Sequence, residues 1–319
     1  MPRLMITGAG GYIGSKIAKD ASSSGYDLQL IDDFSQAQVR SISGINIECI
    51  DICDFDAFRK AAHNVDCVLH LAAVSGVESA AQNPDRAFDV NVKGTRNIAN
   101  FCGANGVPLL FASSMAAVGR PESFPITEAQ HCAPVNLYGT SKLLAESAVS
   151  ELAVNSFPAM GFRITNVYGF HFVEGYPVGK ESVVNKFVDL TLRGFPLRVH
   201  GPGTQARDFI HIRDVSEAFL RGVKVILRQS NEGLRIVNLA YGRWISVLNL
   251  AELVIREASN AGLPTQSFHL VPNPRGDAEI LCSRFEVDIS LFRRLLDFEP
   301  LYTLESFIRS ALSEKNSNQ

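Results

Sequence analysis

The sequence predicts an α/β protein with a doubly wound parallel sheet and a smaller lobe toward the C-terminus. Three observations lead to this fold. Short apolar runs alternate with longer amphipathic runs through the first half of the chain, a glycine-rich turn joins the first such pair, and the alternation stops near Thr165. Strands that are buried on both faces and are each followed by a helix form parallel sheets.

The elements of the first half follow from their periodicity. The expected strands are short apolar runs at Leu4–Thr7, Leu28–Ile31, Ile45–Ile50, Cys67–Leu71, Leu109–Ala112 and Met160–Ile164. The expected helices have apolar residues at helical spacing and cover Tyr12–Ser23, Asp54–Ala62, Ala87–Ala104 and Leu137–Ala153.

After Thr165, glycine and proline divide the chain into shorter elements. Such breaks occur at Phe170–Gly179, Gly194–Pro196, Gly201–Gly203 and Val271–Arg275. Four helical patterns remain, at Glu181–Arg193, Val215–Leu227, Val247–Ala261 and Leu304–Leu312. We therefore expect one domain at residues 1–165, to which some later segments return, and a second lobe made mainly of residues 166–319. Ligands should bind at the carboxyl ends of the strands.

Composition excludes several classes of function. The chain has 319 residues with a formal net charge of −3, which gives no basic surface for nucleic acid or an anionic membrane. No apolar run approaches the ~20 residues of a membrane-spanning helix, and the N-terminus does not resemble a signal peptide. The six cysteines are scattered without a CxxC pair, so we expect reduced thiols, no metal site and a cytoplasmic protein.

The glycine-rich turn predicts a dinucleotide site. Gly8, Gly11 and Gly14 directly follow an apolar strand and open a helix that begins with Tyr12 and Ile13. In that context backbone N–H groups and the positive end of the helix dipole can approach a pyrophosphate without obstruction by Cβ atoms. Residues 1–165 thus have the features of a dinucleotide-binding Rossmann domain.

Asp32 ends the next strand, where a carboxylate can accept hydrogen bonds from both hydroxyls of the adenosine ribose. A 2′-phosphate there would meet Asp32 and Asp33, with no basic residue expected beside them. The expected cofactor is therefore NAD rather than NADP.

Tyr138 and Lys142 lie four residues apart in a predicted helix, so their side chains share one face. An ammonium near a phenol favours the phenolate, and an oxidised nicotinamide would add positive charge, which lowers a pKa that is normally near ~10. The pair Ser113-Ser114 ends a strand and supplies a hydroxyl that could share the proton network of the phenol.

At this point the chain resembles the nucleotide-sugar epimerase/dehydratase group of the extended short-chain dehydrogenase/reductase superfamily, over nearly its full length. The matching motifs are Gly8-x-x-Gly11-x-x-Gly14, Asp51-Ile52, His70-Leu71-Ala72-Ala73, Asn91-Val92-Lys93-Gly94-Thr95, Ser113-Ser114, Tyr138-x-x-x-Lys142, Arg163-x-x-Asn166-x-Tyr168-Gly169, Arg207-Asp208-Phe209-Ile210-His211 and Arg275-Gly276-Asp277.

The resemblance implies a role for each matching residue. Tyr138 is expected to be the catalytic base, Lys142 to bind the nicotinamide ribose and tune Tyr138, and Ser114 to hydrogen-bond the reacting hydroxyl, with Ser113 as the neighbouring possibility. For the cofactor, the resemblance implies that Asp32 holds the adenosine ribose, that Asp51 and Ile52 border the adenine, that Leu71, Ala72 and Ala73 line the cofactor path, and that Asn91 supports the active-site helix.

The second half matches the residues with which the family binds a nucleotide-diphosphate sugar. Arg207 and Arg275 match the arginines that clamp the diphosphate, and Asn166 matches an amide that contacts it. His200 lies near the position of an aromatic residue beside the nucleotide base and could stack there. The family also implies a homodimer formed through the helices at Ala87–Ala104 and Leu137–Ala153.

The expected reaction is inversion at C4 of a UDP-hexose or a related sugar. Tyr138 takes a hydroxyl proton while a hydride passes to NAD, and a transient 4-keto sugar turns before the hydride returns. Dehydratases of the family have an Asp-Glu pair after the serine, and decarboxylases a glutamate, where this chain has Met115 and Ala116. A dehydratase, a decarboxylase, a sugar dehydrogenase or reductase, and a non-catalytic NAD-sensing protein are the alternatives.

Two departures from the family pattern concern the substrate. Val118 replaces a common tyrosine, which predicts a roomier or less polar sugar pocket, and the segment Phe170–Lys180 differs from the usual loop. An unusual sugar is therefore compatible with the sequence.

Overall fold

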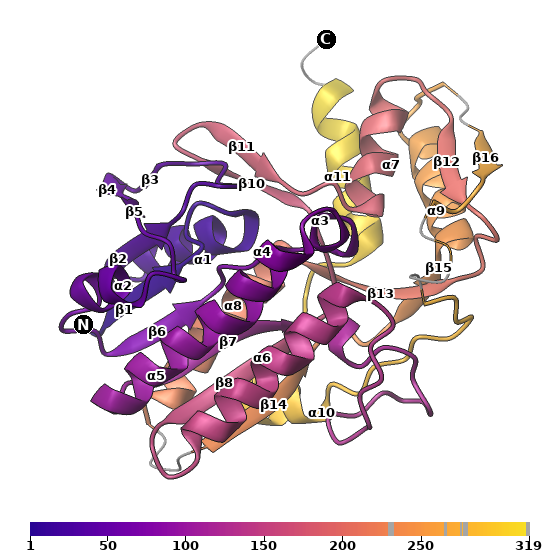
Figure 1. Cartoon of the computed structure of the whole chain (residues 1–319). Helices are drawn as coiled ribbons and strands as arrows, with labels where there is room; N and C mark the ends of the chain where they lie inside the picture. The colour runs from indigo at the N-terminus through magenta and orange to yellow at the C-terminus, as the bar shows by residue number, and fades with distance from the viewer. Residues whose placement is uncertain (229–232, 265–266, 275, 277–279, 317–319) are drawn as a thin grey trace.

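The structure is a computed structural model that describes residues 1–228, 233–264, 267–274, 276 and 280–316. Its centre is a parallel seven-stranded sheet with the order β14-β8-β7-β6-β1-β2-β5 (Figure 1). The strands of this sheet are β1 (Arg3–Thr7), β2 (Asp27–Asp32), β5 (Glu48–Cys49), β6 (Cys67–His70), β7 (Leu109–Ser114), β8 (Pro158–Ile164) and β14 (Gly233–Leu239).

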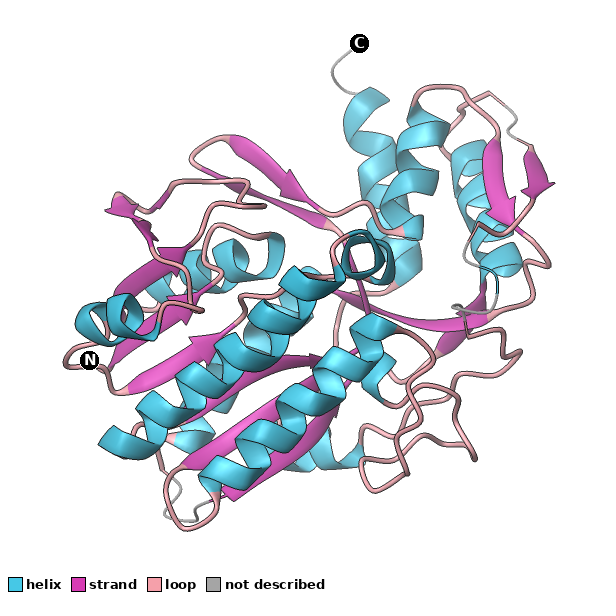
Figure 2. Cartoon of the chain, viewed as in Figure 1, coloured by secondary structure: helices cyan, strands magenta, loops and turns pink. Residues whose placement is uncertain are grey.

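Helices cover both faces of the sheet, as Figure 2 shows. One face carries α2 (Phe55–Ala61), α5 (Thr95–Asn105) and α6 (Leu137–Ala153), and the other carries α1 (Tyr12–Ser23), α8 (Ile212–Ile226) and α10 (Ser290–Leu296). Side chains alternate between the two layers along a strand. In β1, Leu4 and Ile6 belong to the α1–α8 core, whereas Met5 belongs to the opposite core. The predicted doubly wound parallel sheet is confirmed.

The helix expected at Ala87–Ala104 begins earlier and contains a wide turn. Its parts are α4 (Pro84–Phe88), a π-helical turn η1 (Asp89–Gly94) and α5. Pro84 stands at the first position of α4, which its fixed φ and missing N–H favour. Single π-helical turns of this kind occur often at functional sites. A short helix that the periodicity did not reveal, α3 (Val77–Gln82), precedes α4.

The strand expected at Ile45–Ile50 is divided in two. Residues Ile45–Asn46 form β4, which pairs with β3 (Ser41–Ile42), and only β5 joins the large sheet. Ile47 between them is buried, and its N–H donates to the carbonyl of Arg40 (3.0 Å). The chain thus leaves a small hairpin before it enters the sheet edge.

The later segments form smaller sheets with their own core. A three-stranded sheet has the order β15 (Trp244–Ser246), β13 (Ala206–His211) and β9 (Asn166–Tyr168), and β12 (Leu197–His200) pairs with β16 (Phe268–Val271). The helices α7 (Val183–Leu192), α9 (Val247–Asn260) and α11 (Leu304–Asn316) pack with them. Tyr168, Phe187 and Leu250 are among the buried residues of this core.

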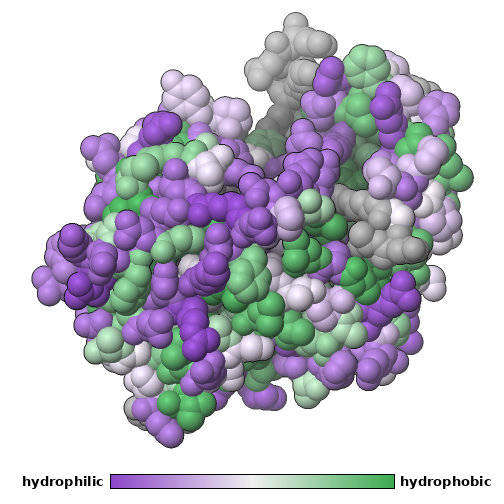
Figure 3. Space-filling model, viewed as in Figure 1, coloured by the Kyte–Doolittle hydropathy of each residue, from purple (hydrophilic) through white to green (hydrophobic). Residues whose placement is uncertain are grey.

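The Gly- and Pro-containing segment Phe170–Gly179 is an antiparallel hairpin of β10 (Phe170–Val173) and β11 (Tyr176–Gly179). Figure 1 shows it above the sheet half, on the way to α7. Hydrophilic and hydrophobic side chains are interspersed over the face seen in Figure 3. No helix among the described residues is long and apolar enough to cross a membrane. All six cysteines are free thiols.

Candidate cofactor and catalytic site

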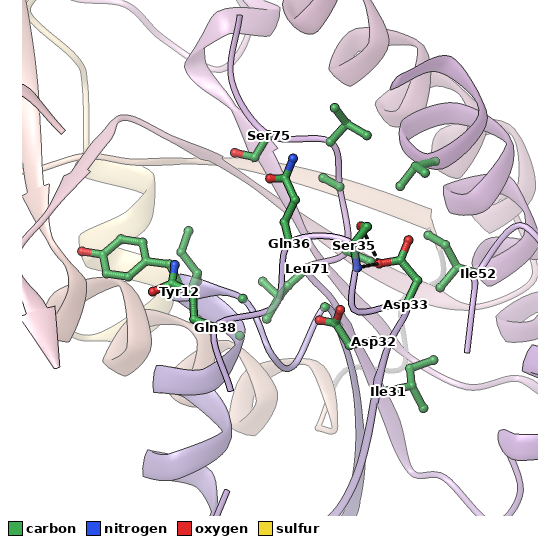
Figure 4. A pocket seen from close by; sticks show the side chains of 18 of the residues that line it. Tyr12, Ile31, Asp32, Asp33, Ser35, Gln36, Gln38, Ile52, Leu71 and Ser75 are labelled. Carbon is green, nitrogen blue, oxygen red and sulfur yellow. Dashed lines mark hydrogen bonds between the residues drawn. The ribbon is translucent and has the colours of Figure 1, made fainter. Parts of the chain in front are cut away.

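A pocket lies at the carboxyl ends of β1, β2 and β6, at the sheet edge where the sequence predicted ligand binding. Figure 4 shows its side chains, with Ser75 and Ile52 on different sides of the space and Asp32 and Asp33 between the surrounding loops. Its lining includes the sequence-predicted residues Gly8, Gly11, Tyr12, Ile13, Gly14, Asp32, Ile52, Leu71, Ala72 and Ala73.

The glycine turn is shaped by close backbone approaches. Gly8 has a φ of +67°, and a Cβ there would lie 2.6 Å from the backbone N of Ala72. A Cβ on Gly14 would lie 2.1 Å from the carbonyl O of Gly8, so only glycine lets α1 start this close to β1. The N-cap of α1 is Gly11, which contributes no side-chain hydrogen bond to the first turn. The first-turn N–H groups therefore fit a pyrophosphate.

Asp32 is held rigidly beside this turn. Its Oδ2 accepts the N–H of Gly10 (3.0 Å) and its Oδ1 accepts that of Phe34 (2.8 Å). Burial raises the pKa of the carboxyl, and these two hydrogen bonds oppose the rise. A carboxylate has about four acceptor sites, so two ribose hydroxyls can still be accepted. The geometry of Asp32 fits the ribose of NAD.

Arg86 is a residue of the site that the sequence did not reveal. Its guanidinium reaches Asp33 (Nη2···Oδ2 2.7 Å) and Asp51 (Nη1···Oδ2 2.9 Å). Hydrogen bonds, including those from Arg86, outweigh burial and lower the pKa of both aspartates. The expectation that no basic residue lies beside Asp33 is thus wrong in three dimensions, because α4 brings Arg86 across from a distant part of the chain.

The remaining cofactor candidates, Asp51 and Asn91, lie beside the pocket and are not among the residues that line it. Asp51 stands next to the pocket residue Ile52 and is engaged with Arg86 and with the N–H of Cys53. Asn91, in the π-helical turn, is buried and clamps the loop after β6, because it accepts the N–H of Val74 (2.8 Å) and donates to the carbonyl of the same residue (3.1 Å). It also donates to Ser141 of α6 (2.9 Å), as a supporting role requires.

Tyr138 lies in the first turn of α6, which Asn136 caps by accepting the N–H of Gly139 (2.9 Å). The Tyr138 hydroxyl is hydrogen-bonded to the hydroxyls of Ser114 and Ser75. Ser75 lines the cofactor pocket, whereas Tyr138, Ser114 and Lys142 are not among its lining residues, so Ser75 connects the phenol to the pocket wall. Ser75 had no signal in the sequence beyond its place after the His70-Leu71-Ala72-Ala73 motif.

The protonation of the pair Tyr138 and Lys142 is governed first by burial. Desolvation raises the pKa of Tyr138, and the hydrogen bonds with Ser114 and Ser75 lower it. The ammonium of Lys142 lies 6.0 Å from the centre of the Tyr138 ring and donates to the carbonyl of Ala112 (2.9 Å). Burial lowers the pKa of Lys142 to about 8. The sequence predicted that the ammonium of Lys142 lowers the pKa of Tyr138. In this structure the pKa of Tyr138 is raised instead, because burial has the largest effect.

Ser113 and Ser114 face opposite ways, because neighbouring residues of a strand alternate. The Ser113 hydroxyl is buried and donates to Glu146 (2.5 Å), whose carboxylate is also paired with Arg163 (Nη2···Oε2 2.7 Å). Ser113 thus belongs to a buried polar cluster that links α6 to β8, and it does not lie beside Tyr138. The expectation of Ser113 as a substrate contact does not agree with its placement.

His70 is a buried structural residue, as its apolar surroundings in the sequence suggest. Its ring nitrogens contact the hydroxyls of Thr7 (2.7 Å) and Thr95 (2.9 Å). Burial lowers the pKa of the imidazole to about 3, so the ring is neutral. His70 thus ties the glycine turn to the start of α5.

The substrate candidates lie in the second half of the chain. Asn166 is exposed on β9, opposite Phe209 of the paired strand β13, and donates to the carbonyl of Asp208 (2.9 Å). The half-buried Arg207 precedes Asp208 on β13. His200 ends β12, in a separate two-stranded sheet. Arg275 lies outside the described residues. The structure therefore places Asn166 and Arg207 on adjacent strands of one sheet and leaves His200 in another sheet.

The positions after Ser114 point into the core. Met115 and Val118 are both buried in the core on the α1–α8 side of the sheet. The expectation that Val118 opens space in a sugar pocket is wrong, since its side chain has no exposed surface. Gly139 lets α6 approach this turn, because a Cβ there would lie 2.3 Å from the carbonyl O of Ala116.

Comparison with known proteins is consistent with this site. The pattern that defines the NAD dependent epimerase/dehydratase family matches residues 4–240. UDP-glucose 4-epimerase of Streptomyces lividans is 32% identical over 267 residues, which cover 80% of each chain.

Solved structures share the fold at low sequence identity. UDP-glucose 4-epimerase of Thermotoga maritima, solved with UDP-glucose, has a TM-score of 0.84 at 23% identity, over 99% of this chain and all of the other. TunA, described as an NAD-dependent NDP-hexosamine 5,6-dehydratase, has a TM-score of 0.81 at 24% identity, over 100% and 99% of the two chains. One fold thus carries two reactions.

Proposed function

Because the chain belongs to the NAD-dependent epimerase/dehydratase family, we propose that it is a nucleotide-sugar epimerase that inverts C4 of a UDP-hexose or a related sugar through a transient 4-keto sugar. The observation that carries the proposal is the Tyr138 hydroxyl, hydrogen-bonded to Ser114 and to Ser75 in the wall of the cofactor pocket. The name of the S. lividans relative supports a UDP-hexose as the substrate.

The residues of the site divide the chemistry between them. NAD, when bound, accepts a hydride from the sugar and returns it. Tyr138 takes the proton of the reacting hydroxyl and later gives it back, while Ser114 holds the oxygen in reach of the phenol. Lys142 fixes the nicotinamide ribose, and its charge favours the phenolate once the cofactor is in place. A positioned base of this kind typically contributes about 10²–10⁴-fold in rate.

Epimerisation is preferred to dehydration because the turn after Ser114 offers no proton donor. Met115 is packed in the core, and the side chain of Ala116 is a methyl group. Elimination of water from a 4-keto sugar needs an acid and a base near C5 and C6, as family dehydratases provide there. The same side chains disfavour a decarboxylase.

The substrate diphosphate is assigned to the second half of the chain. A guanidinium can donate two parallel hydrogen bonds to phosphate oxygens, so Arg207 is the proposed clamp, together with Arg275. Asn166, on the strand beside Arg207, would contact the same group. His200 would stack on the nucleotide base.

We also propose a homodimer in the cytoplasm. Large apolar side chains are exposed at Phe88 of α4 and at Leu137 and Leu144 of α6. The helix α5 packs beside α6. Burial of such side chains against a second copy would remove them from water. Six free cysteines suit a reducing compartment.

The test is a product analysis. The purified protein is incubated with NAD and a panel of UDP-, GDP- and dTDP-hexoses and uronic acids, and the products are separated and weighed by mass spectrometry. The expected result is a new nucleotide sugar of unchanged mass. Loss of water or of carbon dioxide, or NADH in proportion to an oxidised sugar, would instead establish a dehydratase, a decarboxylase or a dehydrogenase.

Two tyrosine variants connect the activity to the site. Tyr138→Phe should reduce kcat by about 10²-fold or more, because it removes the proton acceptor and keeps the ring. Tyr176→Phe is the matched control, since Tyr176 lies exposed on the hairpin, and it should retain activity. Full activity of Tyr138→Phe would show that the phenol is not the base.

A further inference from the structure

Lys180 follows the β10–β11 hairpin and lines the cofactor pocket, although it belongs to the part of the chain after Thr165. Among the described residues that line this pocket, Lys180 is the only one with a basic side chain, whereas Asp32 and Asp33 are acidic. A dinucleotide adds a pyrophosphate with two negative charges to this lining. A cation in the wall would offset this charge, in addition to the N–H groups of the glycine turn.

Lys180 is located at the catalytic end of the pocket. Its Nζ lies 3.5 Å from Oγ of Ser75, and the Ser75 hydroxyl is hydrogen-bonded to Tyr138. The adenosine candidates Asp32 and Ile52 line another part of the same space, as Figure 4 shows for their side chains and Ser75. The ammonium is therefore next to the nicotinamide half of a bound dinucleotide rather than next to its adenine.

Lys180 and Lys142 are close enough to repel each other. Burial is the main cause of the lowered pKa of Lys142; the carboxylate of Glu146 opposes this effect, and the charge of Lys180 adds to it. Two like charges that interact destabilise each other, and an anion bound beside Lys180 would offset this repulsion. The arrangement is thus complementary to a negatively charged ligand at this end.

The backbone around Lys180 is fixed before any ligand binds. Gln38 donates to the carbonyl of Gly179 (2.9 Å) and accepts its N–H (3.1 Å). The carbonyl of Lys180 accepts the side-chain N–H of Asn185 (2.8 Å) and the N–H of Ser182 (2.8 Å). Because the backbone is held in this way, only the side chain of Lys180 has to be ordered when it binds a ligand.

We infer that Lys180 is a cofactor-binding residue that pairs with the pyrophosphate of NAD, so that the β10–β11 hairpin retains the cofactor between turnovers. The inference rests on the NAD-dependent step of the proposed function and not on the identity of the sugar. An enzyme that regenerates NAD in every cycle has no need to release it, and a cation supplied by a second segment of the chain slows that release.

The test measures cofactor binding without any sugar. Protein freed of nucleotide is titrated calorimetrically with NAD and, separately, with adenosine, which lacks the pyrophosphate. Lys180→Met should weaken NAD binding about 10- to 100-fold, as loss of a charge-assisted hydrogen bond predicts, and leave adenosine binding unchanged. The rate of NAD release from the loaded protein should rise in proportion.

Two further variants separate charge from structure. Lys180→Arg keeps the charge and should restore most of the affinity for NAD. Lys186→Met is the matched control, because Lys186 lies on α7, pairs with Glu181 at the surface and should bind NAD like the wild type. Equal NAD affinity of Lys180→Met and wild type would overturn the inference, as would equal weakening toward NAD and adenosine. A wild-type protein that binds no NAD would overturn the proposed function as well.

Discussion

Burial brings the pKa of Lys142 close to the neutral range. The residue is 7% exposed, and desolvation lowers the pKa of its ammonium to about 8 from an ordinary value of 10.5. Below pH 8 the group is charged in both the folded and the unfolded state, so desolvation of the charge lowers the free energy of unfolding by its full amount. Between these two pKa values the folded state binds fewer protons than the unfolded state, so stability from this group rises with pH.

This linkage predicts how Lys142→Met changes stability. At about pH 7 the variant should gain stability relative to wild type, because it removes a buried charge. From about pH 8 to about pH 9.5 the wild type should recover about 2 kcal/mol of unfolding free energy relative to the variant. Urea unfolding of both proteins at several pH values measures the difference, with Lys186→Met as the exposed control. A difference that does not change with pH would contradict the predicted desolvation.

Arg86 joins three elements at the adenosine end of the pocket. It comes from α4 and pairs with Asp33 after β2 and with Asp51 after β5. Because both guanidinium edges are occupied by carboxylates, a 2′-phosphate would have to compete with them. The bridge thus favours NAD by electrostatics, although it brings a cation to the place where NADP enzymes need one.

Asp33→Ser should therefore relax the preference for NAD. The substitution removes one carboxylate and leaves Arg86 tethered by Asp51, so that one edge of the guanidinium can reach a 2′-phosphate. We expect the ratio of NADP to NAD affinity to rise about 10-fold, which corresponds to about 1.4 kcal/mol. Titration with both dinucleotides measures the ratio. Asp56→Ser, which breaks the surface pair with Arg59, is the control and should leave the ratio unchanged.

Sequence periodicity predicted the helices and strands better than it predicted the side-chain contacts between them. The ranges of α1 and α6 agree with those expected, because each has a glycine or asparagine at its N-cap and a long run of regular spacing. Arg86 and Ser75 were missed, since their roles come from contacts with residues that are distant in the chain. The hairpin at Phe170–Gly179 was recognised only as a break, because its short strands carry glycine and proline.

Several contacts fasten the β10–β11 hairpin to the sheet half of the molecule. The hydroxyl of Tyr12 donates to the carbonyl of Gly169 (2.8 Å), and Nζ of Lys19 donates to that of Phe172 (2.7 Å). Ser41 donates to Glu174 (2.8 Å) beyond them. The glycine turn and the hairpin are thus held together across a long stretch of sequence, and a ligand bound to one should stabilise the other.

Hydrogen exchange should reveal this coupling. With NAD, the amides of β10 and β11 should exchange more slowly together with those of residues 8–14, because local opening of the hairpin would release contacts with the bound cofactor. Mass spectrometry of peptides from the protein with and without NAD measures the change. The β12–β16 pair, which lies in another sheet, serves as the internal reference. Protection confined to residues 8–14 would show that the hairpin does not respond.

The large-scale architecture was predictable because the order of strands and helices limits a parallel sheet to few topologies. The sequence could not show which late segment completes the sheet. β14 pairs with β8 from Gly233 opposite Pro158 to Leu239 opposite Ile164, and only the folded structure reveals that register.

The late arrival of β14 has a consequence for biosynthesis. When β8 leaves the ribosome, the polypeptide already contains Ser114, Tyr138 and Lys142, yet the edge of β8 has no neighbour until Leu239 has been made. At about 5–20 residues per second, that interval lasts on the order of several seconds. During this interval one edge of β8 is unpaired in the nascent chain. Unpaired strand edges can pair with other chains, and chaperones shield such surfaces.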